Sequence, residues 1–307
     1  MLDFEPLTLD KRPLYAPYYE EYSQGSCQHS FVSSFCMSGK YGDEVCVRDG
    51  YLFTLRSKRC TDTERIYLFP LGNDKDSEGL KHAVELVLDD ARAHNAAVRF
   101  ETITEHSAIL LDELFPGRFK IEENRDYAEY LYAHDRLAYL PGHEMSSKRH
   151  DLNTFERDFG GRYEVRVIES EEDIELIRPF QKKWLEEKMM RDEDVQLERE
   201  NEAIGLGLDH FFELGMSGII VFIDGKVAGY AYGAPLSRDY YDVIIEKGDK
   251  VSPDIYKILN RDLVVKCCDG IDWINREEDL GVEGLRKAKE SYKPDRLITK
   301  CVAWEVR

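Results

Sequence analysis

The succession of strand and helix patterns in residues 163–306 is the feature that most constrains the fold of this chain. Runs rich in apolar, β-branched and aromatic residues predict strands at 163–168, 218–224, 226–234, 241–246, 270–275 and 297–306. Apolar residues at helical spacing predict helices at 171–187, 198–214, 252–264 and 283–292. Asp224-Gly225 is typical of a hairpin turn, and Ser252-Pro253-Asp254 is typical of a helix start. The expected order is strand, helices, a three-stranded meander, helix, strand, helix and strand, which indicates an α/β (α+β) fold with a mixed sheet.

The first half of the chain shows a weaker version of the same succession. Strands are predicted at 44–48, 51–55, 65–70, 97–102 and 129–132, and helices at 77–95 and 143–159. A chain of 307 residues is also too long for one ordinary core. We therefore expect two tandem domains of one fold, 1–160 and 161–307, that arose by duplication. An unrelated pair of α+β domains is the alternative.

Composition and charge exclude several classes of protein. Acidic residues outnumber basic ones by 61 to 42, and the net charge of −19 repels phosphate backbones, so nonspecific nucleic-acid binding is not expected. No apolar run approaches the roughly 20 residues of a membrane span, and the N-terminus is acidic, so we expect no transmembrane segment and a cytoplasmic location. The seven cysteines include no C-x-x-C pair and have no zinc-ligand spacing with the histidines, so free thiols and no metal are expected.

The stretch 275–294 is the most distinctive part of the sequence. The motifs in it are Asn-Arg-Glu-Glu-Asp-Leu-Gly at 275–281, Gly-Leu-Arg-Lys-Ala-Lys at 284–289 and Ser-Tyr-Lys-Pro at 291–294. Further distinctive residues are Glu246-Lys247 and, near the middle of the chain, Leu140-Pro141-Gly142-His143, Lys148-Arg149 and Asn153. With these motifs the chain resembles a bacterial family that is similar to the C-terminal domain of phosphatidylglycerol lysyltransferases. Its order of strands and helices resembles the GNAT acyltransferase topology.

This resemblance implies two tandem GNAT-like domains with mixed, splayed sheets, the acyl-CoA N-acyltransferase fold. Proteins of this kind move aminoacyl groups from tRNA to lipid or peptide acceptors. The chain departs from the lysyltransferases because it lacks their membrane helices, and Gly248 follows Glu246-Lys247 where alanine is expected. The resemblance implies an acyl- or aminoacyltransferase with an amine or hydroxyl acceptor. The small-molecule or aminoacyl substrate and the oligomeric state stay open.

Carboxylates near the expected end of the meander are the candidates for proton transfer. In a GNAT fold the acyl donor lies where the central strands splay apart, and the resemblance places Glu246 and Lys247 at that opening. The residues of the neighbouring strand that would reach it are Asn275, Arg276, Glu277, Glu278 and Asp279. Glu246 or Glu277 would accept the proton of the attacking group, and the others would bind substrate, a cationic group in particular. The alternatives are a surface ion pair between Glu246 and Lys247 and a solvated turn at 276–279.

The last predicted helix and the middle of the chain supply further candidates. Tyr292 lies where many GNAT enzymes place a tyrosine that protonates the leaving group, and a packing role is the alternative. Arg286 and Lys289 would hold a phosphate or carboxylate, or else pair with acidic neighbours on the same helix. Lys148 and Arg149 form a small basic patch that would meet a phosphate.

The glycine-rich pyrophosphate loop of coenzyme A-dependent GNAT proteins is missing from the sequence. Residues 248–254 read Gly-Asp-Lys-Val-Ser-Pro-Asp, and residues 72–79 in the first half are no closer to a glycine pair. We therefore expect that no cofactor is required, and acyl-CoA or aminoacyl-tRNA stays open as the donor. The alternatives are a conventional acyl-CoA-dependent N-acetyltransferase, a non-catalytic binder of a small cationic metabolite or peptide, and a purely structural protein.

Overall fold

The computed structural model describes residues 2–190, 195–249 and 254–306. Its contacts divide the chain into two compact units. The first unit comprises Met1–Glu129, Glu278–Glu283 and Leu297–Arg307, and the second comprises Tyr130–Glu277 and Gly284–Arg296. Within the described residues, no helix is both long and apolar enough to cross a membrane.

The first unit is built on a seven-stranded sheet with the strand order β1-β2-β3-β4-β5-β14-β6. Its strands are β1 (Glu5–Pro6), β2 (Asp43–Arg48), β3 (Tyr51–Arg56), β4 (Glu64–Tyr67), β5 (Ala97–Thr104), β6 (Phe119–Glu123) and β14 (Lys300–Glu305). Its helices are α1 (Arg12–Tyr22), α2 (Phe31–Cys36), α3 (Ser38–Tyr41), α4 (Ser77–Ala93) and α5 (Glu105–Leu114), with short 3-10 turns at Leu9–Lys11, Ser57–Arg59 and Arg125–Tyr127. Neighbouring strands are antiparallel except for β4 and β5, which run parallel.

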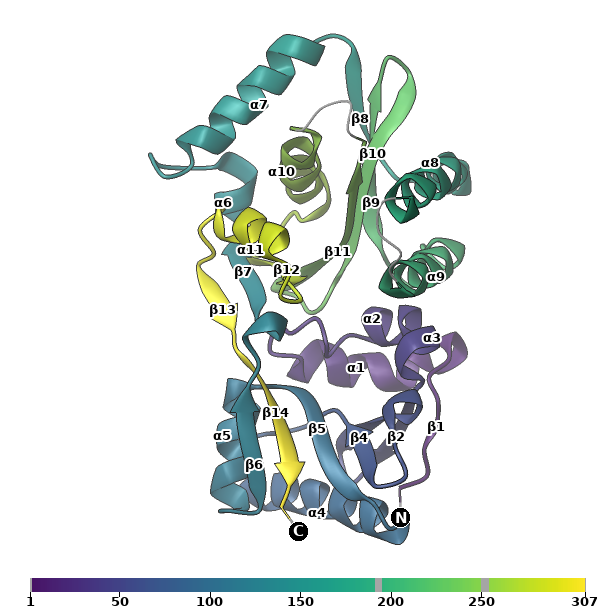
Figure 1. Ribbon diagram of the computed structural model, residues 1–307, viewed down its shortest axis with the longest axis vertical. Coiled ribbons are helices and arrows are strands. Elements are labelled where there is room, and N and C mark those ends of the chain that lie inside the picture. Colours follow the sequence, from purple (N-terminus) through teal and green to yellow (C-terminus); the bar gives the residue numbers. More distant parts are fainter. Residues whose placement is uncertain (1, 191–194, 250–253, 307) are drawn as a thin grey trace. The chain divides into compact units, whose positions relative to one another are not determined.

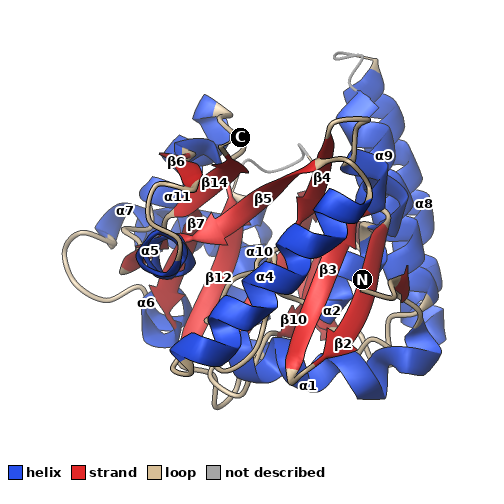
Figure 2. Ribbon diagram, turned by 90° about the horizontal axis from the view of Figure 1, so that it is seen from below, coloured by secondary structure: helices blue, strands red, loops and turns tan. Residues whose placement is uncertain are grey.

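Helix α4 shows how local sequence builds this unit. Asp76 caps its N-terminus by accepting a hydrogen bond from the Gly79 amide at 3.0 Å. Its apolar face, which includes Leu80, Val84 and Leu88, packs into the core against the sheet. Figure 2 shows α4 lying across the face of the sheet. The helix predicted at 77–95 is therefore confirmed to within two residues of its C-terminal end.

The second unit is built around another seven-stranded sheet, with the order β13-β7-β12-β11-β10-β9-β8. Its strands are β7 (Glu129–Ala133), β8 (Tyr163–Val167), β9 (Ser217–Ile223), β10 (Lys226–Pro235), β11 (Tyr240–Gly248), β12 (Trp273–Glu278) and β13 (Arg296–Ile298). Its helices are α6 (His134–Tyr139), α7 (Ser146–Phe159), α8 (Glu171–Met189), α9 (Val195–Asp209), α10 (Ile255–Cys267) and α11 (Glu283–Glu290). Figure 1 shows α8 and α9 on one face of the central strands and α10 on the other.

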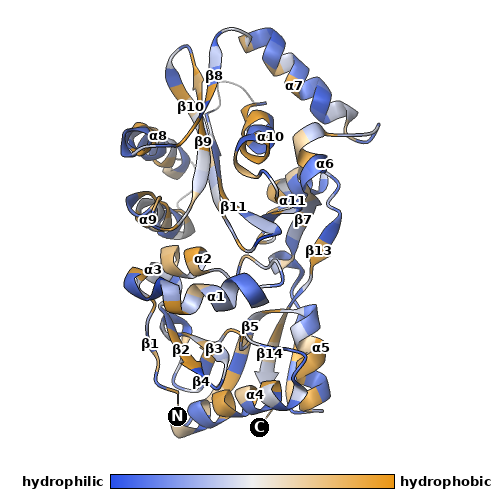
Figure 3. Cartoon of the chain, turned by 180° about the vertical axis from the view of Figure 1, so that it is seen from behind, coloured by the Kyte–Doolittle hydropathy of each residue, from blue (hydrophilic) through white to orange (hydrophobic). Residues whose placement is uncertain are grey.

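The core of the second unit forms between α10 and the meander. Ile255, Leu259 and Leu263 recur along one face of α10 and are fully buried in the same cluster as Ile219 and Val221 of β9. Figure 3 shows hydrophobic colour along α10. The predicted hairpin turn is confirmed, because Asp224 and Gly225 have φ values of 50° and 75° between β9 and β10. Ser252 and Pro253, which the sequence predicts at the start of α10, lie outside the described residues.

Each sheet contains one strand from the far half of the chain. Strand β14, near the C-terminus, lies between β5 and β6 in the sheet of the first unit. Strand β7, from the first half, lies between β13 and β12 in the sheet of the second unit. The compact units are therefore discontinuous, whereas the sequence suggests one cut between residues 160 and 161. The same exchange divides the single strand predicted at 297–306 into β13 and β14.

The α/β architecture with mixed sheets that the sequence predicts is confirmed. Several short elements were not predicted, namely α1, α2, α3, α5, α6, β1 and β6. Helix α1 contains Pro17 in its interior, a residue that disfavours a helical reading because it removes a backbone donor.

Candidate functional site

The parallel strands β11 and β12 stop pairing in the middle of the sheet of the second unit. Their register joins Tyr240 to Trp273 and ends at Asp242 and Asn275. Both strands continue beyond this pair, β11 to Gly248 and β12 to Glu278. We call the point where the pairing ends the junction. Glu246 on β11 and Arg276 on β12 both follow the last pair, which is where the resemblance to GNAT proteins implies that the acyl donor lies.

An ion pair joins the two strands beyond this junction. Nη2 of Arg276 lies 2.5 Å from Oε2 of Glu246, and the two side chains are only 10% and 15% exposed. The other oxygen of Glu246 accepts a hydrogen bond from the amide of Asn260, on α10, at 3.3 Å. Both carboxylate oxygens of Glu246 are therefore engaged, and the residue fixes the position of the guanidinium.

The Arg276 guanidinium retains binding capacity. Its Nε and Nη1 atoms are buried and have no hydrogen-bond partner among the described residues. The guanidinium carbon lies 5.1 Å from the ring centroid of Tyr292 and 5.9 Å from that of Tyr132. Burial lowers the pKa of Arg276, but the Glu246 carboxylate more than offsets this, so the pKa lies above its ordinary value. The group is a permanent cation with two donor nitrogens that have no acceptor among the described residues.

Tyr292 lies just after α11 and is only 6% exposed. Burial raises the pKa of its hydroxyl to about 12, and the Arg276 cation opposes part of this shift. Lys148, on α7, places its Nζ 4.6 Å from the Tyr292 ring centroid. Two cations thus share one aromatic ring, and the Tyr292 hydroxyl stays protonated near neutral pH.

Lys257 of α10 adds a third cation to this group. Its Nζ lies 2.9 Å from Asp254 and 3.8 Å from Asp151, so it is paired with carboxylates. Tyr132 of β7 donates a hydrogen bond to the carbonyl oxygen of Lys289 at 2.7 Å, which ties α11 to the sheet. We refer to Lys148, Glu246, Asn260, Arg276 and Tyr292 as the junction site.

Lys247 is directed away from the junction site. Successive side chains of a strand point to opposite faces, so Lys247 lies on the α8 and α9 side while Glu246 faces α10. Its Nζ is 2.8 Å from Glu200 and 4.1 Å from the ring centroid of Trp184. Glu246 and Lys247 do not pair with each other, which excludes that alternative.

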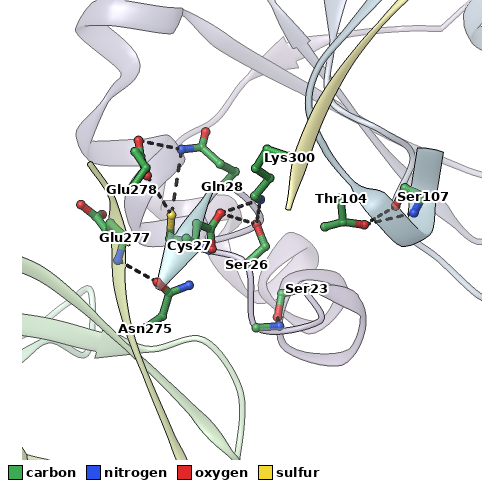
Figure 4. Close-up of polar contacts among 12 residues, drawn as sticks. Ser23, Ser26, Cys27, Gln28, Thr104, Ser107, Asn275, Glu277, Glu278 and Lys300 are labelled. Carbon is green, nitrogen blue, oxygen red and sulfur yellow. Dashed lines mark hydrogen bonds and ion pairs between the residues drawn. The ribbon is translucent and has the colours of Figure 1, made fainter. Parts of the chain in front are cut away.

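The acidic run after Arg276 is divided between different surroundings. The side-chain oxygen of Asn275 accepts a hydrogen bond from the amide of Glu277 at 2.7 Å, and Glu277 has a left-handed φ of 55° (Figure 4). In the first unit, Glu278 lies 3.6 Å from Sγ of Cys27 and 3.5 Å from Nε2 of Gln28 (Figure 4). The predicted acidic cluster is therefore split between the two units.

Asp279 and the basic candidates have structural contacts. The fully buried Asp279 accepts hydrogen bonds from the Gly281 amide at 2.9 Å and from Arg125 at 3.2 Å, both in the first unit. Arg149 donates to the carbonyl oxygens of Leu140 and Gly142, which holds the loop between α6 and α7.

Two further candidates lie on α11. Lys289 lies 5.8 Å from the Tyr130 ring centroid, and Arg286 is partly buried. The predicted roles of all these residues in binding stay predictions. Residues 250–253, part of the stretch that is predicted to lack a pyrophosphate loop, lie outside the described residues.

Asn260 and Tyr132 belong to this region and were not predicted from the sequence. A signal for Asn260 existed, because an asparagine between Leu259 and Leu263 interrupts the apolar face of α10. A buried amide of this kind needs a polar partner. Nothing in the sequence around Tyr132 marks it, because aromatic residues in a strand are ordinary core residues.

Comparisons of the sequence and of the structure with known proteins identify a family and similar solved structures. The family model of the phosphatidylglycerol lysyltransferase C-terminal domain matches residues 19–303. A conserved protein of unknown function from Bacteroides thetaiotaomicron is similar over 100% of both chains, with 27% identity and a TM-score of 0.91. No curated protein matches the sequence.

More distant structures share the fold. The C-terminal domain of a candidate lysylphosphatidylglycerol synthetase from Agrobacterium fabrum has 12% identity and a TM-score of 0.69, over 98% of this chain and 93% of the other. L-PGS from Bacillus licheniformis has 15% identity and a TM-score of 0.67 over the same shares. A tandem GNAT protein from the clavulanic acid biosynthesis pathway has 11% identity and a TM-score of 0.50, over 100% of this chain and 98% of the other. The tandem GNAT-like fold predicted from the sequence is confirmed.

Proposed function

The chain belongs to the phosphatidylglycerol lysyltransferase C-terminal family, and from this premise we propose that it transfers an aminoacyl or related acyl group from an activated ester to an amine or hydroxyl acceptor. The junction site of the second unit carries the reaction. The observation that supports this most directly is the buried Arg276 guanidinium, which is held by Glu246 while Nε and Nη1 lack acceptors among the described residues.

Arg276 stabilises the charge that develops during acyl transfer. When an amine or hydroxyl attacks an ester, the carbonyl oxygen gains negative charge. Fixed donors at a buried position stabilise that charge without reorganising water. Arg276 supplies two such donors, and Glu246 and Asn260 keep the guanidinium in place before substrate binds.

Tyr292 protonates the leaving group. An ester releases an alkoxide, which needs a proton as the carbon–oxygen bond breaks. The Tyr292 hydroxyl, with a pKa of about 12, carries its proton at neutral pH and is still a stronger acid than an alcohol. Its ring lies against the Arg276 guanidinium, so the proton donor and the oxyanion donor are neighbours.

A donor-consumption assay tests this proposal. The purified protein is incubated with aminoacyl-tRNA carrying a labelled amino acid, and separately with labelled acyl-CoA, each with phosphatidylglycerol vesicles or small amines as acceptor. Loss of label from the donor and its appearance in the acceptor are followed. We expect transfer from an aminoacyl donor. Arg276→Met and Tyr292→Phe should lower kcat by roughly 10²- to 10³-fold, which is the usual contribution of such groups.

Matched controls lie on the same unit. Arg157 and Tyr139 are exposed, so Arg157→Met and Tyr139→Phe should leave the transfer rate unchanged. Transfer from acyl-CoA alone would instead identify a conventional N-acetyltransferase. Ligand binding without consumption of either donor would contradict the proposal and favour a non-catalytic binder.

A further inference from the structure

Lys148 is the cation of the junction site that lacks a carboxylate partner. Among the described residues, no carboxylate lies within ion-pair distance of its Nζ, and the contact that it makes is with the Tyr292 ring at 4.6 Å. The two acids whose charges act on it, Asp151 and Asp254, are paired with Lys257 at 3.8 Å and 2.9 Å. In the part of the chain that the structure describes, Lys257 thus has carboxylate partners and Lys148 has no counter-ion.

The surroundings of Lys148 favour its neutral form. Burial lowers its pKa first, and the Lys257 and Arg276 cations lower it further, whereas Asp151 and Asp254 raise it. These groups lie on α7, at the N-terminal end of α10 and on β12. An amine with a lowered pKa has a lone pair available closer to neutral pH.

Glu246, one of the two glutamates predicted as the base, is poorly placed for that role. Its two oxygens accept hydrogen bonds from Arg276 and Asn260, and taking a proton would weaken its ion pair with the buried Arg276 guanidinium. Tyr292 cannot act as the base either, because it carries its proton at neutral pH. The junction site therefore contains an oxyanion donor and an acid, and Lys148 is the group left to accept a proton.

We propose that the neutral amine of Lys148 is the general base that deprotonates the attacking amine or hydroxyl. The inference rests on the proposed transfer reaction. As the acceptor's nitrogen or oxygen forms its bond to the acyl carbon, its proton passes to Nζ of Lys148, which becomes an ammonium. The bond from the acyl carbon to the leaving oxygen breaks, and that oxygen takes the proton of Tyr292. Return of the proton from Lys148 to the tyrosinate, directly or through water, restores both groups.

Two substitutions separate a base from a residue that binds an anion. Lys148→Arg keeps the positive charge but has no neutral form near pH 7, and Lys148→Met removes both. For a base, both variants should lose about 10²- to 10³-fold in kcat with KM nearly unchanged, and ethylamine added to the Met variant should restore part of the rate. The acid limb of the wild-type pH–rate profile should disappear in both.

Lys266→Met, on the exposed end of α10, is the control and should behave as wild type. An Arg variant with wild-type kcat would overturn the proposal.

A second measurement does not depend on activity. Trace labelling of the amines with acetic anhydride at different pH values, read by peptide mass spectrometry, reports the titration of Lys148 and of Lys266 in one sample. We expect Lys148 to titrate at a lower pH than Lys266. If it titrates with Lys266, the base proposal fails even though the enzyme transfers. If it titrates low but the wild-type protein transfers nothing, the fault lies with the proposed function.

Discussion

The two units of this protein have a similar backbone conformation where a central parallel pair of strands stops pairing. In the first unit, β4 and β5 pair in parallel up to Tyr67 and Phe100, and in the second, β11 and β12 pair up to Asp242 and Asn275. The next residue in each case is charged and mostly buried, Glu101 or Arg276. The residue after it, Thr102 or Glu277, has a left-handed φ of 51° or 55°. This correspondence supports a common origin of the two units.

The difference lies in how each buried charge is satisfied. Glu101 is surrounded by three guanidinium groups, those of Arg59 at 3.1 Å, Arg99 at 3.4 Å and Arg56 at 3.6 Å. Arg276 has one carboxylate partner, Glu246, and keeps two nitrogens without acceptors among the described residues. Arg56 and Arg99 also each keep a buried Nε without a hydrogen-bond partner among the described residues, so the contrast lies in the charges: three guanidinium groups gather around Glu101, whereas a single carboxylate, Glu246, pairs with Arg276. A repeated fold therefore need not repeat a site.

The largest effect is expected from Arg276→Met. It leaves Glu246 mostly buried without its counter-ion, which should lower the free energy of unfolding by about 3–5 kcal/mol. The double variant Arg276→Met, Glu246→Leu removes both charges and should recover most of that stability without recovering transfer. Urea unfolding and the transfer assay measure the two effects. A double variant that transfers at the wild-type rate would remove Arg276 from the mechanism.

Glu101→Gln is the matching change in the first unit. It should also destabilise, by about 2 kcal/mol, because three arginines lose a shared carboxylate. Its transfer rate per folded molecule should equal that of the wild type, because the proposed reaction takes place at the junction site of the second unit and does not involve Glu101. A large fall in kcat would mean that both junctions serve the reaction.

The first unit should also be the more sensitive to acid. His29 is 3% exposed, and burial, aided by the nearby Lys300 cation, lowers its pKa from 6.5 to about 3. Between these values the unfolded chain binds more protons than the folded one, so stability falls as the pH is lowered through this window. From pH 6.5 to 5 the loss should be roughly 2 kcal/mol. Urea midpoints measured across this range should show the slope in wild type and lose it in His29→Leu; an unchanged slope would assign the sensitivity to other groups.

The smallest effect concerns the left-handed residues that the two junctions share. Thr102 is β-branched and has a buried hydroxyl without a hydrogen-bond partner, so Thr102→Gly should stabilise the protein by about 1 kcal/mol. Glu277→Gly should gain less, because glutamate is not branched at Cβ. Thermal unfolding measures both changes. The Glu277 variant has a second use, since loss of transfer would support the catalytic role predicted for its carboxylate, and retained transfer would exclude it.

Local signals in the sequence predicted many of the elements. Helix α4 has a capping aspartate and an apolar face at helical spacing, and the hairpin between β9 and β10 has Asp224-Gly225. These features depend on neighbouring residues alone, so no knowledge of the rest of the chain is needed. Helix α1 was missed because Pro17 argues against it locally, and its stability comes from packing, as the buried Tyr15 and Tyr19 show.

The exchange of strands could not be read from local patterns. Residues 297–306 look like one strand, and nothing in their side chains says that β13 and β14 belong to different sheets. Strand order depends on contacts between residues more than a hundred positions apart, as in the pairing of β14 with β5. Propensity and periodicity contain no information about which distant strand provides the partner.

The sequence by itself determined the family and the α/β class, and it singled out the run 275–294, which contains both Arg276 and Tyr292 of the proposed site. Only the tertiary structure decided which of its charges act together. Side-chain alternation along β11 sends Glu246 toward Arg276 and Lys247 toward Glu200. The fold also brings Lys148 over Tyr292 from a position more than a hundred residues away. Such pairings depend on strand register and helix packing, which are long-range properties that no short stretch of sequence contains.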